Sequence, residues 1–301
     1  MPSIIVQNIV KNFGSYIAVD DVSFSVEAGE IFGLLGPNGA GKTTSIRIIL
    51  DIFKPDSGTV SILGGPMSEE KKNNIGYLPE ERGLYQDIPL ERCLVYLATL
   101  KGMENSLAQE RVNKYLVRFD LIEWRKKKVK ELSKGMQQKA QLITTLVHQP
   151  QIIVIDEPFS ALDPVNTQMV KDLLREERDS GKTIIMCTHQ MHQVEELCDR
   201  LVLIDHGQSM LYGTLHDVRK QFAKPAVALS TPDPLPALIP GVDSIKQENS
   251  DYTLHLLPGH STQELLQTLV KANIHIEKFE IAMPTLDEIF IDVVQKQGAV
   301  Q

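Results

Sequence analysis

The sequence has little of what marks secreted, membrane-spanning or nucleic-acid-binding proteins. Its three cysteines, Cys93, Cys187 and Cys198, form no metal-like pair, which favours reduced thiols and a cytosolic setting. No apolar run approaches the roughly 20 residues of a membrane helix. The first residues also lack the charged and apolar regions of a secretory signal. The 31 Lys and Arg residues are outnumbered by 39 Asp and Glu residues, and the net charge of −8 argues against a general nucleic-acid binder.

One short segment departs from this acidic balance. Residues 125–130 read Arg-Lys-Lys-Lys-Val-Lys, and we interpret them as a solvated face. The length of 301 residues permits one substantial core and a smaller second unit.

A complete phosphate loop is the most informative feature that is present. The motif G-x-x-x-x-G-K-[ST] directly follows the apolar run 30–35, which we expect to be a strand, and a helix should follow. In that setting backbone N–H groups and the positive end of the helix dipole converge on phosphate oxygens. The sequence therefore predicts binding of a nucleoside triphosphate, with Lys42 at the β- and γ-phosphates and the Thr43 hydroxyl on Mg²⁺. The predicted binding residues are Gly36, Pro37, Asn38, Gly39, Ala40, Gly41, Lys42, Thr43 and Thr44.

Two acids end a second apolar run, residues 152–155. Because side chains alternate along a strand, we expect Asp156 and Glu157 to have different tasks. Asp156 is assigned to the Mg²⁺ shell and Glu157 to polarising the attacking water. The alternative is a strand that ends in solvated acids.

Two further segments admit both a structural and a functional interpretation. Ser133 is a candidate N-cap of a helical pattern that reaches His148. The Ser133 hydroxyl and the Gly135 N–H are also candidates for a second anion site at the γ-phosphate. His189 follows the apolar run 183–187, at the sheet edge where ligands collect in open α/β folds, which favours function over a structural role.

In this order and spacing, the segments resemble the ATP-binding cassette (ABC) ATPase family over about residues 3–220. The resemblance implies that Phe13 stacks on adenine, with Tyr16 as the alternative and core packing as a third possibility. It implies that Glu80 stands where the family usually carries glutamine and joins Thr43 and Asp156 around Mg²⁺. It also implies that Asp163, in the segment Ser160-Ala-Leu-Asp163, lies at a dimer interface. His189 would be the switch residue at the γ-phosphate.

The sequence departs from the family pattern at two places. Lys134 and Met136 replace the usual glycine and glutamine of the signature segment, while Ser133 and Gly135 are retained, so we expect activity to be kept. Glu80 strengthens metal coordination but adds negative charge near the triphosphate and Glu157, which would slow hydrolysis or shift its pH dependence. The surrounding stretch, 76–85, is similar to that of sodium- and drug-efflux subunits.

The resemblance also implies a division of labour between chains. No arginine next to the catalytic strand offers charge from the far side of the γ-phosphate. Ser133 and Gly135 would come from a second ATPase subunit, identical or paralogous, in a head-to-tail dimer. We expect a transport ATPase, more specifically an exporter, peripheral on the inner face of the cell membrane and bound to integral membrane permease subunits through Leu84, Tyr85 and Ile88. The alternatives are a soluble ABC ATPase acting on ribosomes or nucleic acid, and a low-turnover ATP switch.

The predicted organisation is an α/β chain with two domains. Residues 1–222 form a phosphate-loop NTPase core, a mixed sheet with an antiparallel β layer, interrupted by a helical lobe at about 84–150. Residues 223–301 form a small α+β accessory domain, set off by five prolines between 225 and 240. In it we expect strands at 226–230, 242–247, 252–257 and 274–281, and helices at 261–272 and 285–294. Its histidines lack close ligand spacing, so no metal site is expected there.

Overall fold

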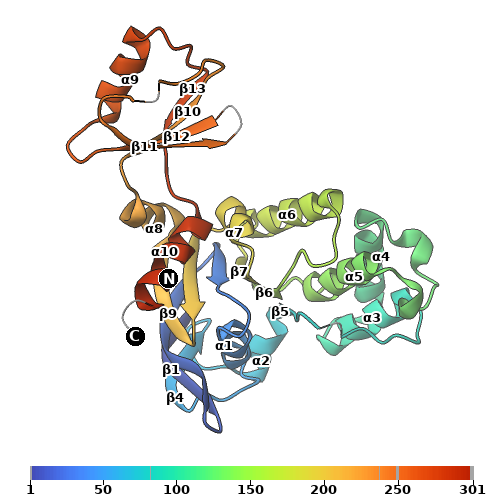
Figure 1. Cartoon of the computed structure of the whole chain (residues 1–301). Helices are drawn as coiled ribbons and strands as arrows, with labels where there is room; N and C mark the ends of the chain where they lie inside the picture. The colour runs from blue at the N-terminus through green and yellow to red at the C-terminus, as the bar shows by residue number, and fades with distance from the viewer. Residues whose placement is uncertain (1, 82, 237, 249–250, 299–301) are drawn as a thin grey trace. The chain divides into compact units, whose positions relative to one another are not determined.

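The chain divides into two compact units, Met1–Thr214 and Leu215–Gln301. The computed structural model describes residues 2–81, 83–236, 238–248 and 251–298 (Figure 1). The first unit ends eight residues before the predicted boundary at 222, because α8 (Leu215–Phe222) belongs to the second unit.

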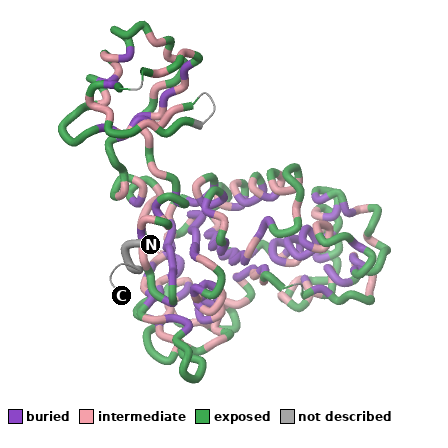
Figure 2. Tube along the Cα trace, viewed as in Figure 1, coloured by how far each residue is buried: buried purple, intermediate pink, exposed green. Residues whose placement is uncertain are grey.

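A six-stranded sheet forms the centre of the first unit. Its order is β5-β6-β7-β3-β8-β9, with every neighbouring pair parallel except β8 and β9. The middle strands are buried on both faces, which explains their continuous apolar runs. Figure 2 shows this burial as purple along the central strands. The strands are β3 (Ile31–Leu35), β5 (Ile75–Leu78), β6 (Ile152–Asp156), β7 (Thr183–Thr188), β8 (Arg200–Asp205) and β9 (Gln208–Thr214).

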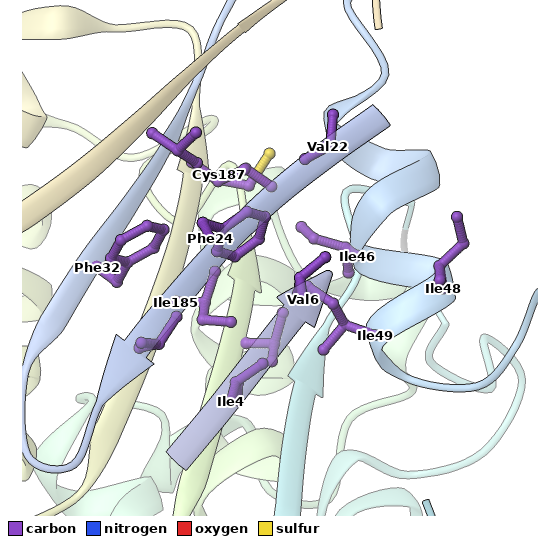
Figure 3. Close-up of a cluster of buried hydrophobic side chains, with 14 of the residues drawn as sticks. Ile4, Val6, Val22, Phe24, Phe32, Ile46, Ile48, Ile49, Ile185 and Cys187 are labelled. Carbon is purple, nitrogen blue, oxygen red and sulfur yellow. The ribbon is translucent and has the colours of Figure 1, made fainter. Parts of the chain in front are cut away.

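An antiparallel layer, ordered β2-β1-β4, packs on that sheet through a shared apolar core. It consists of β1 (Pro2–Phe13), β2 (Tyr16–Glu27) and β4 (Ser57–Ile62). The core between the layers is apolar, and the rings of Phe24 and Phe32 stack at 5.3 Å within it. Figure 3 shows these rings beside Ile185 and Cys187 of β7, with Ile46 and Ile49 of α1 on the other side. This mixed sheet with an antiparallel layer confirms the predicted fold class.

The helices of the first unit fall into two groups, those beside the sheet and those of the helical lobe. Those beside the sheet are α1 (Lys42–Ile49), α2 (Glu69–Asn73), α6 (Pro164–Asp179) and α7 (Met191–Leu197). The helical lobe, turquoise to green in Figure 1, contains α3 (Leu90–Leu100), α4 (Asn105–Arg118) and α5 (Lys134–Leu146), with two short 3₁₀ turns, η1 (Ile122–Trp124) and η2 (Val129–Glu131). The lobe thus enters the chain between β5 and β6, within the predicted interval.

The second unit is a four-stranded antiparallel sheet with a small core of its own. The order is β11-β12-β10-β13, and α9 supplies Leu265 and Leu269 to the core. The strands are β10 (Ala226–Ser230), β11 (Val242–Glu248), β12 (Asp251–Leu256) and β13 (Lys278–Ile281), and the remaining helices are α9 (Thr262–Lys271) and α10 (Leu286–Gly298). The strand predicted at 274–281 exists only from Lys278 onward. The chain before it turns at Asn273, which has a φ of 54°.

No helix in the described part of the chain is both long and apolar enough to cross a bilayer. All three cysteines are buried, and burial raises the pKa of Cys187 and Cys198 well above the usual thiol range. These thiols are therefore core residues and are not placed for reaction with solvent.

Candidate nucleotide site

The candidate site is a cavity at the carboxyl edge of the parallel strands. Its volume is 330 Å³, and it opens between the end of β3, the end of β6 and the tip of the β1–β2 hairpin. Ligands collect at this edge in open α/β sheets. The lining residues are Tyr16, Ala18, Asn38, Gly39, Gly41, Lys42, Thr43, Thr44, Glu80, Asp156 and Glu157.

Two glycines give the phosphate loop a shape that no side chain would allow. Gly36 has a φ of 147°, and a Cβ there would lie 2.0 Å from the Ile204 carbonyl oxygen. Gly41 has a φ of 102°, and its Cβ would lie 2.3 Å from the Ala18 oxygen. Both positions therefore require glycine, and the loop backbone is left facing the cavity as an anion cradle.

The Lys42 ammonium is held by the loop itself. The side chain is buried, and Nζ donates to the carbonyl oxygens of Gly36 and Pro37 at 2.8 and 2.9 Å. Among the described residues, this buried cation has only carbonyl partners, and it lies at the centre of a glycine cradle. Such a site suits a polyphosphate, which would supply the missing negative charge. The loop therefore fits the triphosphate that its sequence predicts.

Thr43 and Asp156 connect this loop to the neighbouring acidic strand. The Thr43 hydroxyl donates to Asp156 Oδ2 at 3.1 Å. Hydroxyl and carboxylate oxygens are the ligands that Mg²⁺ takes from phosphate-loop proteins. The described residues contain no cluster of three or more His, Cys, Asp or Glu side chains able to hold a metal alone. Thr43 and Asp156 would therefore hold magnesium together with phosphate oxygens of a bound triphosphate.

The backbone conformation of Glu157 differs from that of Asp156. Strand β6 ends at Asp156, and Glu157 has a left-handed φ of 52°. The two acid side chains therefore take different positions because Glu157 has a left-handed backbone conformation, and not because side chains alternate along a strand. The Glu157 carboxylate accepts a hydrogen bond from the Thr188 hydroxyl at 3.2 Å and one from the His189 N–H at 3.0 Å. His189 Nδ1 also lies 2.6 Å from Glu157 Oε1, so the two predicted catalytic residues are in direct contact.

Glu80 lies in the same cavity as Asp156 and Glu157. Lys42 is the single cation among the described lining residues, against three carboxylates. Nearby, burial and the Asp156 charge raise the pKa of Tyr77 to about 12, so this phenol stays neutral beside the acids. The site without nucleotide therefore carries an excess of negative charge that a divalent cation would relieve.

The two candidate aromatic residues flank the turn between β1 and β2. Phe13 is 45 % exposed and contacts Phe53 edge to face, with the ring centroids 5.6 Å apart. Tyr16 lines the cavity, and its hydroxyl donates to the Gly39 carbonyl oxygen at 3.2 Å. Tyr16 is thus tied to the phosphate loop, while the Phe13 ring remains available at the hairpin tip. Adenine stacking on Phe13 stays a prediction.

Ser133 and Gly135 lie outside the cavity lining of their own chain. Ser133 is exposed and caps α5 by accepting a hydrogen bond from the Met136 N–H at 3.2 Å. A Cβ on Gly135 would lie 2.9 Å from the Ala161 carbonyl oxygen, which leaves little room for any other residue. Asp163 caps α6 through the Asn166 N–H, and that hydrogen bond lowers the pKa of its carboxyl group.

Two residues that sequence reasoning did not single out support Glu157. Thr188 holds its carboxylate, as described above. Gln138, buried on α5, donates to the carbonyl oxygens of Glu157 and Pro158 at 3.4 and 3.3 Å. The polar Gln138 inside a helical apolar pattern was the available signal, whereas nothing in the sequence places it beside β6.

A strand, a glycine cradle and a helix that carries Lys42 and Thr43, with acids ending a neighbouring strand, define a phosphate-loop NTPase. The family model for ABC transporters matches residues 19–160. The model for the C-terminal domain of DrrA1-3-like ATP-binding proteins matches residues 213–294. The chain belongs to the ATP-binding subunits of ABC transporters, a family of ATPases.

Relatives align over most of the chain. It is 39% identical to the ABC transporter ATP-binding protein YhaQ of Bacillus subtilis, over 98% of both chains. It is 29% identical to the linearmycin resistance ATP-binding protein LnrL of Bacillus subtilis, over 95% of this chain and 96% of that one. It is 35% identical to the Nod factor export ATP-binding protein I of Burkholderia lata, over 76% of each. A solved ATP binding subunit of an ABC transporter superimposes with a TM-score of 0.68 and 31% identity, over 73% of this chain and 92% of that one.

Replacing Phe13 by alanine should weaken ATP binding about tenfold, since stacking of a base on an aromatic ring contributes about 1–3 kcal/mol. Affinity for inorganic tripolyphosphate, which has no base, should not change. Fluorescent-nucleotide titration with tripolyphosphate competition measures both. Tyr16→Phe, which removes only the hydroxyl, is the matched control. If Phe13→Ala binds ATP like the unaltered protein while Tyr16→Ala does not, Tyr16 is the adenine contact.

Replacing Glu80 by glutamine should raise the Mg²⁺ concentration for half-maximal ATP hydrolysis about fivefold, because one of the three carboxylates that line the cavity is lost. The measurement is steady-state ATPase activity across a magnesium titration. Glu81→Gln removes a charge from the next residue, which is exposed and lies outside the cavity lining. Equal magnesium curves for both variants would remove Glu80 from the metal's surroundings.

Proposed function

We propose that this chain is the ATPase motor of a membrane exporter, working as a head-to-tail dimer on separate integral membrane permease subunits. It would act at the cytoplasmic face of the membrane as a peripheral protein. The observation that carries the proposal is the one-sided site. The phosphate loop and three acids line the cavity, whereas Ser133 and Gly135 lie elsewhere on the chain.

The charge at this cavity explains why a second chain is needed. Developing charge on the γ-phosphoryl oxygens must be met on every side for fast transfer. Lys42 covers one side, and no arginine belongs to the described lining. The exposed Ser133, at the positive N-terminal end of the 13-residue helix α5, is a suitable donor from a partner copy. Two copies would then enclose two ATP molecules, and hydrolysis would allow the two copies to separate.

The residues at the cavity suit hydrolysis of the bound triphosphate. Glu157 would orient the attacking water, with its carboxylate held by Thr188 and His189. His189 is half exposed, so its ring is free to turn from Glu157 toward the γ-phosphate. Thr43 and Asp156 would hold a magnesium ion, which would supply charge neutralisation at the triphosphate.

Export rather than import is supported by the relatives. One carries a Nod factor export name and another a linearmycin resistance name, and the second unit matches the DrrA1-3-like C-terminal domain. A permease contact is supported by the segment before α3. Tyr85 is 51 % exposed and Ile88 is partly exposed there. Leu84, which was expected to join them, is 6 % exposed and packs inward, so it offers no surface.

Glu157→Gln should form a stable dimer with ATP, because the nucleotide joins the subunits and is no longer consumed. Size-exclusion chromatography with light scattering measures the mass with and without ATP. Ser133→Ala in the same background should return the protein to the monomer. Steady-state ATPase activity should be high in the unaltered chain and absent in Glu157→Gln, which distinguishes a motor from a low-turnover switch. A Glu157→Gln protein that stays monomeric at saturating ATP, with or without permease, would contradict the dimer mechanism.

Tyr85→Ala should lower the recovery of an integral membrane protein that co-purifies with the tagged chain from detergent-solubilised membranes. The expected loss is about tenfold, typical of truncating an aromatic anchor. Ile17→Ala, at another exposed apolar side chain, is the control. Quantitative mass spectrometry of the eluates makes the comparison. Co-purification of ribosomal proteins or nucleic acid in place of a membrane protein would favour the soluble class of ABC ATPase.

A further inference from the structure

The basic segment of the helical lobe is built as a fixed, exposed surface. We define the basic loop as residues 124–130, which join η1 to η2 and contain one arginine, four lysines and no acid. The whole chain, in contrast, has a net charge of −8. Val129 is fully buried and anchors the loop in the lobe. Lys126, Lys127 and Lys128 are exposed.

Backbone hydrogen bonds set the loop against the segment that leads into α3. The N–H groups of Val129 and Lys130 donate to the carbonyl oxygens of Ile88 and Gln86 at 3.1 and 3.0 Å. In return, Leu90 donates to the Lys127 oxygen at 2.9 Å. The basic loop therefore lies beside the segment 85–88 that is proposed to meet the permease.

The acids around the loop leave its three consecutive lysines without partners. Asp87 forms an ion pair with Lys130 at 2.6 Å. The Glu131 carboxylate accepts a hydrogen bond from the Lys128 N–H at 2.7 Å. In the part of the chain that the structure describes, Lys126, Lys127 and Lys128 form no ion pair. Beside them, the Trp124 ring is 38 % exposed.

We propose that the basic loop binds the anionic headgroups of the membrane, with Trp124 entering the headgroup layer. Exposed ammonium groups on flexible stems give a diffuse positive surface, which suits mobile lipid phosphates. An indole ring that is partly exposed beside them suits the membrane–water boundary. Among the described residues, none of these lysines lines the cavity at the phosphate loop or the cavities at Arg118–Glu176 and at Ile48–Met67. The proposal rests on the proposed function only in that the permease brings this surface to the bilayer.

The test is flotation of the purified full-length chain with vesicles of phosphatidylcholine alone or with phosphatidylglycerol added. Binding should require phosphatidylglycerol and fall with added salt. Lys126→Gln, Lys127→Gln and Lys128→Gln together should weaken it about 100-fold, since each lysine near an anionic surface contributes roughly fivefold. Trp124→Ala should weaken it as well.

The matched control removes three positive charges elsewhere. Lys220, Lys224 and Lys271 are exposed residues of the second unit, and their joint replacement by glutamine should leave binding within about twofold, because they lie outside the basic loop. All variants should keep the ATPase activity of the unaltered chain. Single lysine replacements, each expected to cost about fivefold, test the same surface with the smallest disturbance of the fold.

Four results of the vesicle experiment would overturn the proposal. They are equal binding to both kinds of vesicle, unchanged binding of the triple variant, an equal loss in the control variant, and displacement by inorganic phosphate at constant ionic strength, which would indicate a soluble-anion site. Loss of permease recovery in detergent by the triple variant, with vesicle binding intact, would assign the loop to the protein partner and also overturn it. Vesicle binding needs neither ATP nor a second chain, so it can fail while the Glu157→Gln dimer forms, and the reverse.

Discussion

The site depends on the parallel register of three adjacent strands. Leu35 of β3 pairs with Thr188 of β7, and Asp156 of β6 pairs with Cys187 of β7. The residues that follow each strand therefore emerge together at one edge of the sheet. The Glu157 N–H donates to the Cys187 carbonyl oxygen at 2.9 Å, which extends this backbone pairing one residue beyond β6. Backbone pairing between the strands therefore suffices to place the phosphate loop, the acids and His189 together.

The same edge holds backbone conformations that cost free energy. Glu157 is a non-glycine residue at a φ of 52°, a conformation that costs of order 1–3 kcal/mol. Hydrogen bonds to its carboxylate from Thr188 and His189, and to its carbonyl oxygen from Gln138, offset that cost. The strained conformation places the Glu157 side chain in the cavity next to Asp156. In an extended strand, the same side chain would point to the opposite face of the sheet.

The sequence predicted the phosphate loop and the Ser133 cap because each is specified by adjacent residues. It predicted the fold class from the order and spacing of motifs along the chain. Strand β5 was missed because four residues, one of them Gly76, carry no readable alternation. The strand is set by its pairing with β6, which lies more than 70 residues further along the chain. The separation of Glu157 from Asp156 was predicted from strand alternation, whereas the structure gives Glu157 a positive φ with hydrogen-bond partners in β7 and α5.

Helix α5 links Ser133 mechanically to the support of Glu157. It begins at Ser133, which faces solvent, and about one and a half turns later it carries Gln138 against the carbonyl oxygens of Glu157 and Pro158. Gly135, between them, fits closely against the Ala161 carbonyl oxygen. A phosphate bound at Ser133 would therefore act on a rigid element that already supports Glu157 of the same chain. In the proposed dimer, the Glu157 carboxylate of each copy would respond to the nucleotide held by its partner.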